Sequence, residues 1–410
     1  MQNILLSIFQ PLFKNGRILT KKEEYSFLKG VDPLLTAKLE NGQIIVLTKE
    51  MQKPGYLLEL RKKESFYCPV CAERLILKIG RKRISHFSHG KGSNCKEQHD
   101  TESENHLNGK LQLYGWLKEQ GLRPVLEQYF PEIKQRADLI FQYEGKMYAI
   151  EYQCSQIDVE IFRRRTKGYQ KLKIFPIWIL GSPPPTWHSS RKNSISDFHY
   201  LFLRKNQHHH FFLPAYCSMK KQFLFLHHLF PISVRNCFSQ NVIKPLNQMD
   251  ITYLLEPIFS TEVQLNNWRK ELETFKIQLL MFRAHEREKF IRELYASRLH
   301  PLYLPPFVGI PLKHNIVFHS PPFIWQGYVF LDHFFGRKKG TVLSFIKILK
   351  SVKRRIYFNE IKIRQIPNID QNLLPFAIKE YIFFLEKWGI LRRVSNHQYI
   401  LLQNIEIVRN

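Results

Sequence analysis

Hydrophobic and polar residues alternate over residues 136–153 on both sides of a short turn, and this pattern predicts a β-hairpin. Side chains of a strand point alternately to its two faces, so Asp138 and Arg136 share a face of the first strand. Glu151 and Gln153 share a face of the second strand. Burying unpaired carboxylates is costly, so a positive partner should lie between them. A divalent cation with oxygen ligands is one such partner, and arginines such as Arg136 are the alternative.

The pattern predicts further elements around this hairpin. They are an N-terminal hairpin, two helices and one apolar strand, at residues 37–46, 101–119, 158–172 and 174–181. Asn41–Gly42 is a turn sequence typical of hairpins. Thr101 and Glu104 form a capping box at the start of the first helix. The order helix, strand, strand, helix, strand predicts a compact α/β unit.

A proline-rich break at residues 182–185 separates this unit from the rest of the chain. Short apolar segments then predict an aromatic-rich β-meander, with the His208–His210 run in an exposed turn, at residues 198–203, 211–216 and 222–226. The remainder is mainly helical, with predicted helices at residues 261–299, 326–335, 342–357 and 374–388. The chain ends in a helix followed by a hairpin, an ending typical of a winged helix, which is a common DNA-binding shape.

The charge balance points to a polyanionic partner. The chain has 410 residues and a net charge of +27, with the basic residues spread along its length. Nucleic acid is the commonest polyanion, and no basic amphipathic anchor favours a membrane surface instead. Of the six cysteines, two form a Cys-x-x-Cys and the other four are scattered, a usage typical of a reducing cytoplasm and not of a disulfide framework. No apolar run is long enough to span a membrane, and the N-terminus is a poor signal peptide.

Cysteine and histidine residues gather in one short region, and their spacing predicts a tetrahedral zinc site. The candidate ligands are Cys68, Cys71, His86, His89 and Cys95, with His99 close behind. These candidates outnumber the four ligand positions of a tetrahedral zinc site, and Cys95 could replace either His86 or His89. Arg81 and Arg83 lie inside this module and could contact phosphate. The alternative is a redox or merely buried cysteine pair.

The predicted helix at residues 101–119 brings further polar groups toward the hairpin. Glu102, His106 and Lys110 are spaced four apart and therefore lie on one helical face. Glu102 could complete a carboxylate triad with Asp138 and Glu151; Glu104 is the alternative donor. Such a triad would hold Mg²⁺ or Mn²⁺, which lowers the pKa of a bound water and stabilises charge on a phosphodiester.

This stretch resembles the restriction-endonuclease-like superfamily, whose pattern is a helical Glu, then Asp, then Glu-x-Lys. It is more closely similar to the competence protein CoiA family. The resemblance rests on Cys68–Cys71, His86–His89, Glu102–His106 with Lys110, Arg136–Asp138, Ile150–Ser155, Arg165–Tyr169 and Trp178–Leu180. It implies a cytoplasmic protein of naturally transformable bacteria that processes or recombines incoming DNA beside the RecA recombinase.

One position departs from the superfamily pattern, because Gln153 stands where Lys is usual. Glutamine can orient a water by hydrogen bonds but supplies no charge. Lys110 or Arg165 could supply that charge from a helix. Arg165 and Tyr169, one helical turn apart, could also clamp a DNA phosphate, and packing of the second helix is the alternative. Arg136 is a further candidate for contact with DNA.

We therefore predict a multidomain α/β (α+β) protein. An N-terminal β-hairpin and zinc module leads into a restriction-endonuclease-like core and a mainly α-helical C-terminal half with a winged-helix end. The predicted boundaries give a poorly patterned extension, the hairpin and zinc module, the core, a linker with the meander, and the helical domain: residues 1–34, 35–100, 101–181, 182–260 and 261–410. An amphipathic helix is the alternative for the extension.

Two main hypotheses follow for the function. The first is a Mg²⁺- or Mn²⁺-dependent deoxyribonuclease with a structural Zn²⁺, acting in natural transformation. The second is a non-catalytic DNA-binding mediator of RecA-dependent recombination. Glu102, Asp138 and Glu151 favour the first, and Gln153 favours the second. A regulator that binds promoters is a third possibility, for which no clear recognition helix is evident.

Overall fold

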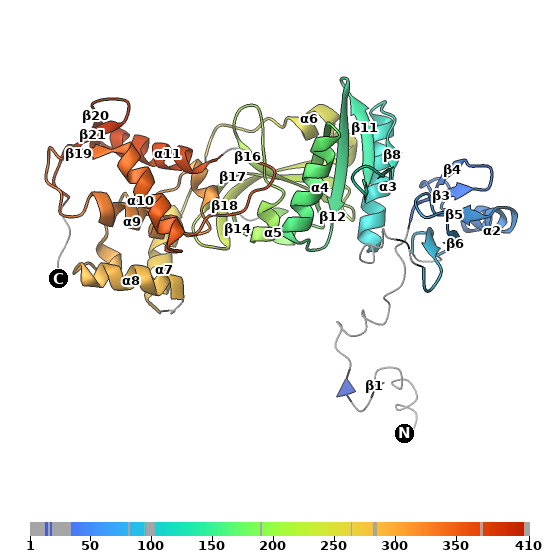
Figure 1. Cartoon of the computed structure of the whole chain (residues 1–410), viewed down its shortest axis with the longest axis horizontal. Helices are drawn as coiled ribbons and strands as arrows, with labels where there is room; N and C mark the ends of the chain where they lie inside the picture. Colours follow the sequence, from blue (N-terminus) through green and yellow to red (C-terminus); the bar gives the residue numbers. More distant parts are fainter. Residues whose placement is uncertain are drawn as a thin grey trace. The chain divides into compact units, whose positions relative to one another are not determined.

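The computed structural model describes residues 13–14, 17–18, 34–80, 83–93, 95, 103–188, 191–263, 265–281, 285–369 and 372–405. The chain divides into two compact units, residues 1–151 and 152–410, and Figure 1 traces the order of their elements. Within the predicted N-terminal extension, the described residues are the paired strands β1 (Phe13–Lys14) and β2 (Arg17–Ile18), together with Leu34, which forms an isolated bridge with Phe87. The rest of that extension lies outside the described residues.

The first unit opens with a five-stranded antiparallel sheet of order β4-β3-β5-β6-β7. Its elements are β3 (Thr36–Leu39), β4 (Ile44–Val46), β5 (Phe66–Tyr67), β6 (Arg74–Lys78) and β7 (His86–His89), with helix α2 (Pro54–Lys63) between β4 and β5. The predicted N-terminal hairpin is confirmed as β3 and β4, and Gly42 has the positive φ of +87° that its turn requires. Leu57, Phe66 and Phe87 are fully or nearly fully buried in the core of this module.

The second part of the first unit joins a helix to antiparallel strands that pair in the order β12-β11-β8. The elements are α3 (Glu104–Glu119), β8 (Val125–Leu126), β9 (Tyr129–Phe130), β10 (Gln135–Arg136), β11 (Leu139–Tyr143) and β12 (Lys146–Gln153). The predicted hairpin is confirmed, with Leu139 opposite Ile150 and Ile140 opposite Ala149. The boundary between the two units falls inside β12, after Glu151.

Two details of this region differ from the prediction. Helix α3 begins at Glu104, because Ser103 is the residue whose side chain caps it by accepting from the His106 N–H; the predicted start at Thr101 was wrong. The predicted first strand is also split. Arg136 belongs to β10 and pairs with Tyr129, so the chain leaves that ladder before β11 begins at Leu139.

The sheet of the second unit has the order β14-β18-β17-β16-β13, with β15 beside β16. The elements are α4 (Val159–Lys171), β13 (Ile174–Gly181), η2 (Pro185–His188), β14 (Lys192–Ser194), α5 (Asp197–Tyr200), β15 (Arg204–Lys205), β16 (Phe211–Cys217), β17 (Gln222–Pro231) and β18 (Asn236–Pro245). Helix α4 and strand β13 confirm their predictions. The predicted strand at residues 198–203 was wrong: Ser196 and His199 form a capping box there and start α5.

The helical part of the second unit holds α6 (Ile251–Leu255), α7 (Trp268–Met281), α8 (His285–Ala296), α9 (Pro322–His333), α10 (Phe345–Tyr357) and α11 (Leu374–Lys387). Single turns lie at η3 (Leu246–Gln248), η4 (Pro301–Tyr303) and η5 (Lys313–Val317). The single helix predicted at residues 261–299 is therefore two helices, α7 and α8. Within the described residues, no helix is both apolar enough and long enough for a membrane crossing.

The C-terminal end has the topology of a winged helix, as predicted. Helix α9 is followed by β19 (Val342–Ser344), α10, α11, β20 (Leu391–Arg393) and β21 (Gln398–Leu401). The strands form an antiparallel sheet of order β19-β21-β20, which places the first strand beside the last. The predicted helix at residues 342–357 thus begins with a strand, because Val342 and Leu343 pair with β21 before α10 starts.

Candidate functional site

The cysteine-rich module brings together a compact set of metal-ligating groups. Ligating atoms of Cys68, Cys71, His89 and Cys95 all lie within 4.8 Å of one another. Cys68 and Cys71 sit in a tight turn after β5, in which the Val70 N–H points to the Cys68 Sγ at 3.4 Å. The Cys71 Sγ lies 3.3 Å from the His89 Nε2. This is a three-thiol, one-imidazole set of the kind that binds Zn²⁺.

Strand β7 separates the two candidate histidines. His86 and His89 are three residues apart in β7, so their side chains point to opposite faces. The His86 Nδ1 lies 3.0 Å from the Ile84 carbonyl oxygen, outside the cluster. The structure therefore places Cys95, and not His86, in the fourth position. His99 lies outside the described residues.

The protonation state of the cysteine cluster depends on whether a metal cation is bound. Burial raises the pKa of the Cys71 thiol to about 12, and the neighbouring thiols of Cys68 and Cys95 add to the rise. Burial also lowers the pKa of His89, with a further lowering by the charge of Arg136. His89 is therefore neutral, the form that binds a metal. A bound Zn²⁺ would hold the thiols as thiolates and tie the turn after β5 to β7.

A second polar cluster lies where α3 meets the start of β11. The His106 Nε2 is 3.2 Å from one carboxylate oxygen of Asp138, and the Lys110 Nζ is 3.9 Å from the other. Lys110 is 1% exposed, whereas Asp138 and His106 keep 14% and 16% of their side chains exposed. The helical spacing of four residues brings both groups to Asp138, as the sequence predicted.

Glu127 is a member of this cluster that the sequence did not reveal. Its carboxylate accepts from the Lys110 Nζ at 2.8 Å, from the Leu35 and Thr36 N–H groups and from the Thr36 hydroxyl. Burial would raise the pKa of Glu127, but the charges of Lys110 and Arg136 lower it below its ordinary value. The only hint in the sequence is Lys110 itself, which lies beside the apolar stripe of α3 and therefore needs a buried partner.

Glu151 and Gln153 follow one another on the same face of β12. Glu151 is 3% exposed and follows Ile150, which pairs with Leu139, the first residue of β11. Asp138 directly precedes β11, so the first strand does not include it, contrary to the prediction. The Gln153 side chain donates to the Ser155 carbonyl oxygen at 3.1 Å and to its hydroxyl at 3.2 Å. Glu102, the third predicted carboxylate, lies outside the described residues.

The predicted DNA-contacting residues lie in different environments. Arg83 is exposed, and Arg81 lies outside the described residues. Arg136 is 9% exposed, and its charge acts on His89 and Glu127, so its position favours an internal role. In the second unit, Arg165 lies 5.9 Å from the Trp178 ring centroid, and Tyr169 is fully buried. The packing alternative therefore fits Tyr169, and the phosphate clamp does not.

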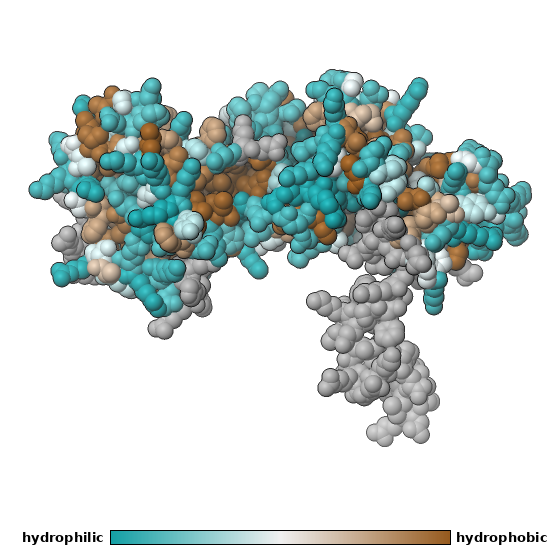
Figure 2. Space-filling model, in the orientation of Figure 1, coloured by the Kyte–Doolittle hydropathy of each residue, from teal (hydrophilic) through white to brown (hydrophobic). Residues whose placement is uncertain are grey.

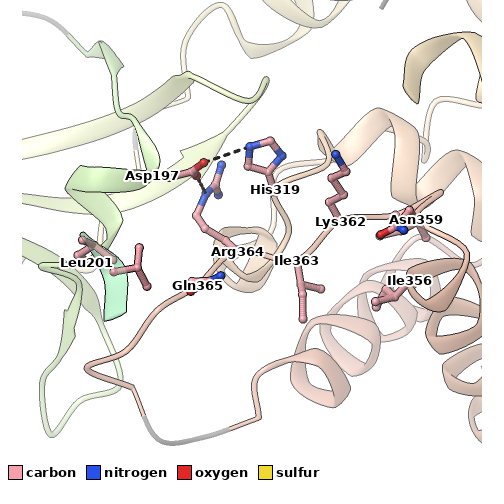
Figure 3. Close-up of a pocket in the computed structure, with 11 residues that line it drawn as sticks. Asp197, Leu201, His319, Ile356, Asn359, Lys362, Ile363, Arg364 and Gln365 are labelled. Carbon is pink, nitrogen blue, oxygen red and sulfur yellow. Dashed lines mark hydrogen bonds and ion pairs between the residues drawn. The ribbon is translucent and has the colours of Figure 1, made fainter. Parts of the chain in front are cut away.

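The second unit also has a pocket of about 440 Å³. Figure 3 shows Asp197 facing His319 and Arg364 at its wall. The two contacts measure 3.2 Å each, and Arg364 also donates to the Phe318 carbonyl oxygen at 2.9 Å. The hydrogen bond from His319 lowers the pKa of Asp197. These charges bind one another and the main chain, so the pocket wall serves the packing of this unit.

Comparison with known proteins places all these features in one family. Family models match the N-terminal domain of competence protein CoiA over residues 49–98, its nuclease-like domain over residues 102–258 and its C-terminal domain over residues 263–410. Competence protein CoiA of Bacillus subtilis (strain 168) is 32% identical over 343 residues, which cover 83% of this chain and 91% of that protein. The chain belongs to the competence protein CoiA family. No solved structure matches it.

Membership of the CoiA family confirms the resemblance found in the sequence and assigns the chain to competence. The polar cluster of His106, Lys110, Glu127 and Asp138 falls inside the nuclease-like domain, as does Glu151. The cysteine cluster falls inside the CoiA N-terminal domain. The winged-helix topology falls inside the CoiA C-terminal domain.

Proposed function

We propose that this CoiA family protein is a metal-dependent DNA nuclease that acts on incoming or recombining DNA during natural transformation. The observation that carries the proposal is the meeting of His106 and Lys110 with Asp138, which directly precedes β11, the strand that pairs with the Glu151-bearing β12. Carboxylates next to a lysine are the parts that a phosphodiester-cleaving site needs. The net charge of +27 would hold the DNA through its phosphates.

Asp138 and Glu151 supply the hard oxygen ligands that Mg²⁺ or Mn²⁺ prefers, and Glu102 is proposed as a third. When bound, such an ion lowers the pKa of a water and stabilises the charge of the phosphodiester. The residues of the chain prepare the site. His106 fixes the orientation of the Asp138 carboxylate. Lys110 brings a buried positive charge to within 3.9 Å of Asp138, a charge that Gln153 does not supply.

The cysteine cluster is proposed to hold a structural Zn²⁺ that fixes the module preceding the nuclease-like domain. Its free thiols fit a reducing compartment, so we place the protein in the cytoplasm.

A second candidate function is a DNA-binding mediator of RecA-dependent recombination that does not cleave. The orientation of Gln153 favours it, because the side chain is bonded to Ser155 and brings no charge to Glu151. Under this alternative, the charge on the surface would still bind DNA.

The two functions differ in a cleavage assay with labelled single-stranded, duplex and branched DNA in Mg²⁺, Mn²⁺ or EDTA. We expect cleavage by the wild type that requires the ion and falls at least about 100-fold in Glu151→Gln, since the substitution removes a charged ligand but keeps its shape. Glu144→Gln is the matched control, because Glu144 is an exposed carboxylate in the turn of the same hairpin.

Cleavage that persists in Glu151→Gln would place the chemistry elsewhere. Absence of cleavage by the wild type on every substrate, together with equal DNA binding by all variants, would replace the nuclease by the mediator.

A further inference from the structure

Every charged residue on the exposed face of helix α10 is cationic. The helix contains no Asp or Glu, and its buried side is formed by Phe345, Ile348, Val352 and Arg355. At 3.6 residues per turn, the exposed residues fall together on the opposite side. These residues are Ile346, Lys347, Lys350, Lys353, Arg354 and Tyr357. The helix therefore has the composition of a surface for a polyanion.

The acidic residues near α10 are bound on its buried side. Arg355 is 4% exposed and forms ion pairs with Asp332, Glu293 and Glu360. Its guanidinium also lies 4.1 Å from the Tyr328 ring centroid. This network fixes the rotation of α10 and turns the lysines outward. Of the cations on the exposed face, Arg354 approaches Asp332 at 3.7 Å.

Two aromatic side chains lie at the C-terminal end of this cationic face. Tyr357 is 81% exposed and Phe358 is 56% exposed, and their ring centroids lie 5.2 Å apart with the planes at 82°. Exposed rings beside lysines are typical of surfaces on which unpaired bases stack. Helix α10 is labelled in the helical part of Figure 1, and this part of Figure 2 mixes hydrophilic and hydrophobic surface.

The wing and α11 extend the surface at the other end of α10. The Phe345 N–H donates to the His397 carbonyl oxygen at 2.9 Å, and the two rings stack with centroids 6.0 Å apart. The Lys379 Nζ of α11 lies 5.6 Å from the Phe345 ring centroid. The wing is the hairpin of β20 and β21, and Arg392 and Arg393 are exposed on its first strand, β20.

The composition of helix α11 argues against base-specific recognition of duplex DNA. It occupies the place of the recognition helix, yet it contains no Arg, Asn or Gln, and Lys379 and Lys387 are its only exposed side chains of the kinds that pair with base edges in the major groove. Its exposed residues include Phe376 and Phe383, at 48% and 54% exposure. In a duplex, the faces of the bases are stacked on one another, so aromatic side chains cannot stack on them. In single-stranded DNA, those faces are accessible to aromatic side chains.

We propose that α10, with Tyr357, Phe358 and the wing, forms a binding site for single-stranded DNA. The lysines of α10 contact successive phosphates, and the two rings stack on unpaired bases. The proposal refines the DNA ligand of the proposed function and does not require cleavage. It gives the CoiA C-terminal domain a role in presenting a strand, separate from the polar cluster of the nuclease-like domain.

The test is fluorescence anisotropy with the zinc-loaded full chain carrying Glu151→Gln, so that cleavage plays no part. The probes are a labelled oligothymidylate and a duplex of the same length. We expect tighter binding to the single strand. The double variant Tyr357→Ala/Phe358→Ala should weaken it about tenfold or more, with little effect on the duplex.

The triple variant Lys347→Gln/Lys350→Gln/Lys353→Gln should lower the slope of log affinity against log salt by about 2 for the single strand. The matched control is Lys63→Gln/Lys220→Gln/Lys270→Gln, which removes the same charge from exposed sites on other elements. Circular dichroism checks that each variant is folded.

The proposal would be overturned if the α10 triple variant and the control triple variant lowered the salt slope equally. It would also be overturned if the protein bound the duplex more tightly than the single strand, or if the aromatic double variant bound the single strand with unchanged affinity. Absence of cleavage in the separate assay would contradict the nuclease and leave this binding result standing.

Discussion

The cysteine cluster and the polar cluster at Asp138 both gather metal-ligating groups, but they balance charge differently. In the cysteine cluster, three thiols and a neutral imidazole lie within 4.8 Å, and burial keeps Cys71 protonated without a metal. In the polar cluster, protein cations already compensate the carboxylates: Lys110 binds Glu127 at 2.8 Å, and His106 contacts Asp138 at 3.2 Å.

The cysteine cluster therefore needs a bound metal ion to hold its ligands together, whereas the polar cluster at Asp138 is held together by the protein's own ion pairs. Structural zinc contributes folding free energy because its ligands converge only when the ion is present. A preorganised acidic site keeps its geometry through buried ion pairs and can exchange its ion with solvent. We therefore expect loss of zinc to unfold the first module and loss of Mg²⁺ to leave the nuclease-like domain folded.

The largest effect is expected at the cysteine cluster. His89→Ala should abolish zinc binding, which contributes about 10 kcal/mol or more in structural sites, and should unfold the module over residues 34–95. His86→Ala is the matched control, since His86 lies on the same strand but outside the cluster. Metal analysis and limited proteolysis measure the two variants. Zinc retained in His89→Ala, or lost in His86→Ala, would show that the assignment of ligands is wrong.

The next effect is expected at Glu127. Glu127→Gln should lower the free energy of unfolding by about 3–5 kcal/mol, because it removes the carboxylate that the buried Lys110 contacts at 2.8 Å and leaves Asp138, at 3.9 Å, as the more distant one. Chemical denaturation of the zinc-loaded protein measures this loss. The double variant Lys110→Met/Glu127→Gln should recover part of it, since the buried lysine charge is removed together with its partner. If the double variant loses the sum of both single losses, the two residues do not act as a pair.

A smaller change in the free energy of unfolding is expected at acidic pH. The pKa of Glu127 lies below its ordinary value of 4.5, so its stabilising contribution is present above that value and is lost as pH falls through the folded-state pKa. The free energy of unfolding of the wild type should therefore fall more steeply on acidification than that of Glu127→Gln. Zinc ligation weakens equally in both proteins, so the difference between the two curves isolates Glu127. Parallel curves would contradict the role given to Lys110 and Arg136.

The sequence predicted the parts of both sites that follow from spacing. The period of a helix predicted His106 and Lys110 on one face, and both reach Asp138 in the structure, whereas Asp138 itself precedes β11 and does not lie within the strand predicted to contain it. Glu127 could not be found in this way, because its partners Leu35 and Thr36 lie far away in the chain. The order of strands in the sheets likewise depends on pairings that local pattern does not encode.

The errors of prediction arose where local signals compete. At residues 198–203, apolar residues suggested a strand, but the capping box of Ser196 and His199 started a helix. At Val342, a helical period extended back into residues that pair with β21 instead. The spacing of the cysteines and histidines left the choice between His86, His89 and Cys95 open. The opposite orientations of His86 and His89 on β7 leave His89, together with Cys95, in the set of ligands.

The most direct test of the central claim is a titration of the zinc-loaded protein with Mn²⁺, followed by electron paramagnetic resonance. The account predicts a Mn²⁺ site in the wild type and in the control Glu144→Gln that is lost in Asp138→Asn, while the zinc content stays unchanged in all three. The same Mn²⁺ binding in Asp138→Asn and in the wild type would contradict a divalent cation site at Asp138 and Glu151.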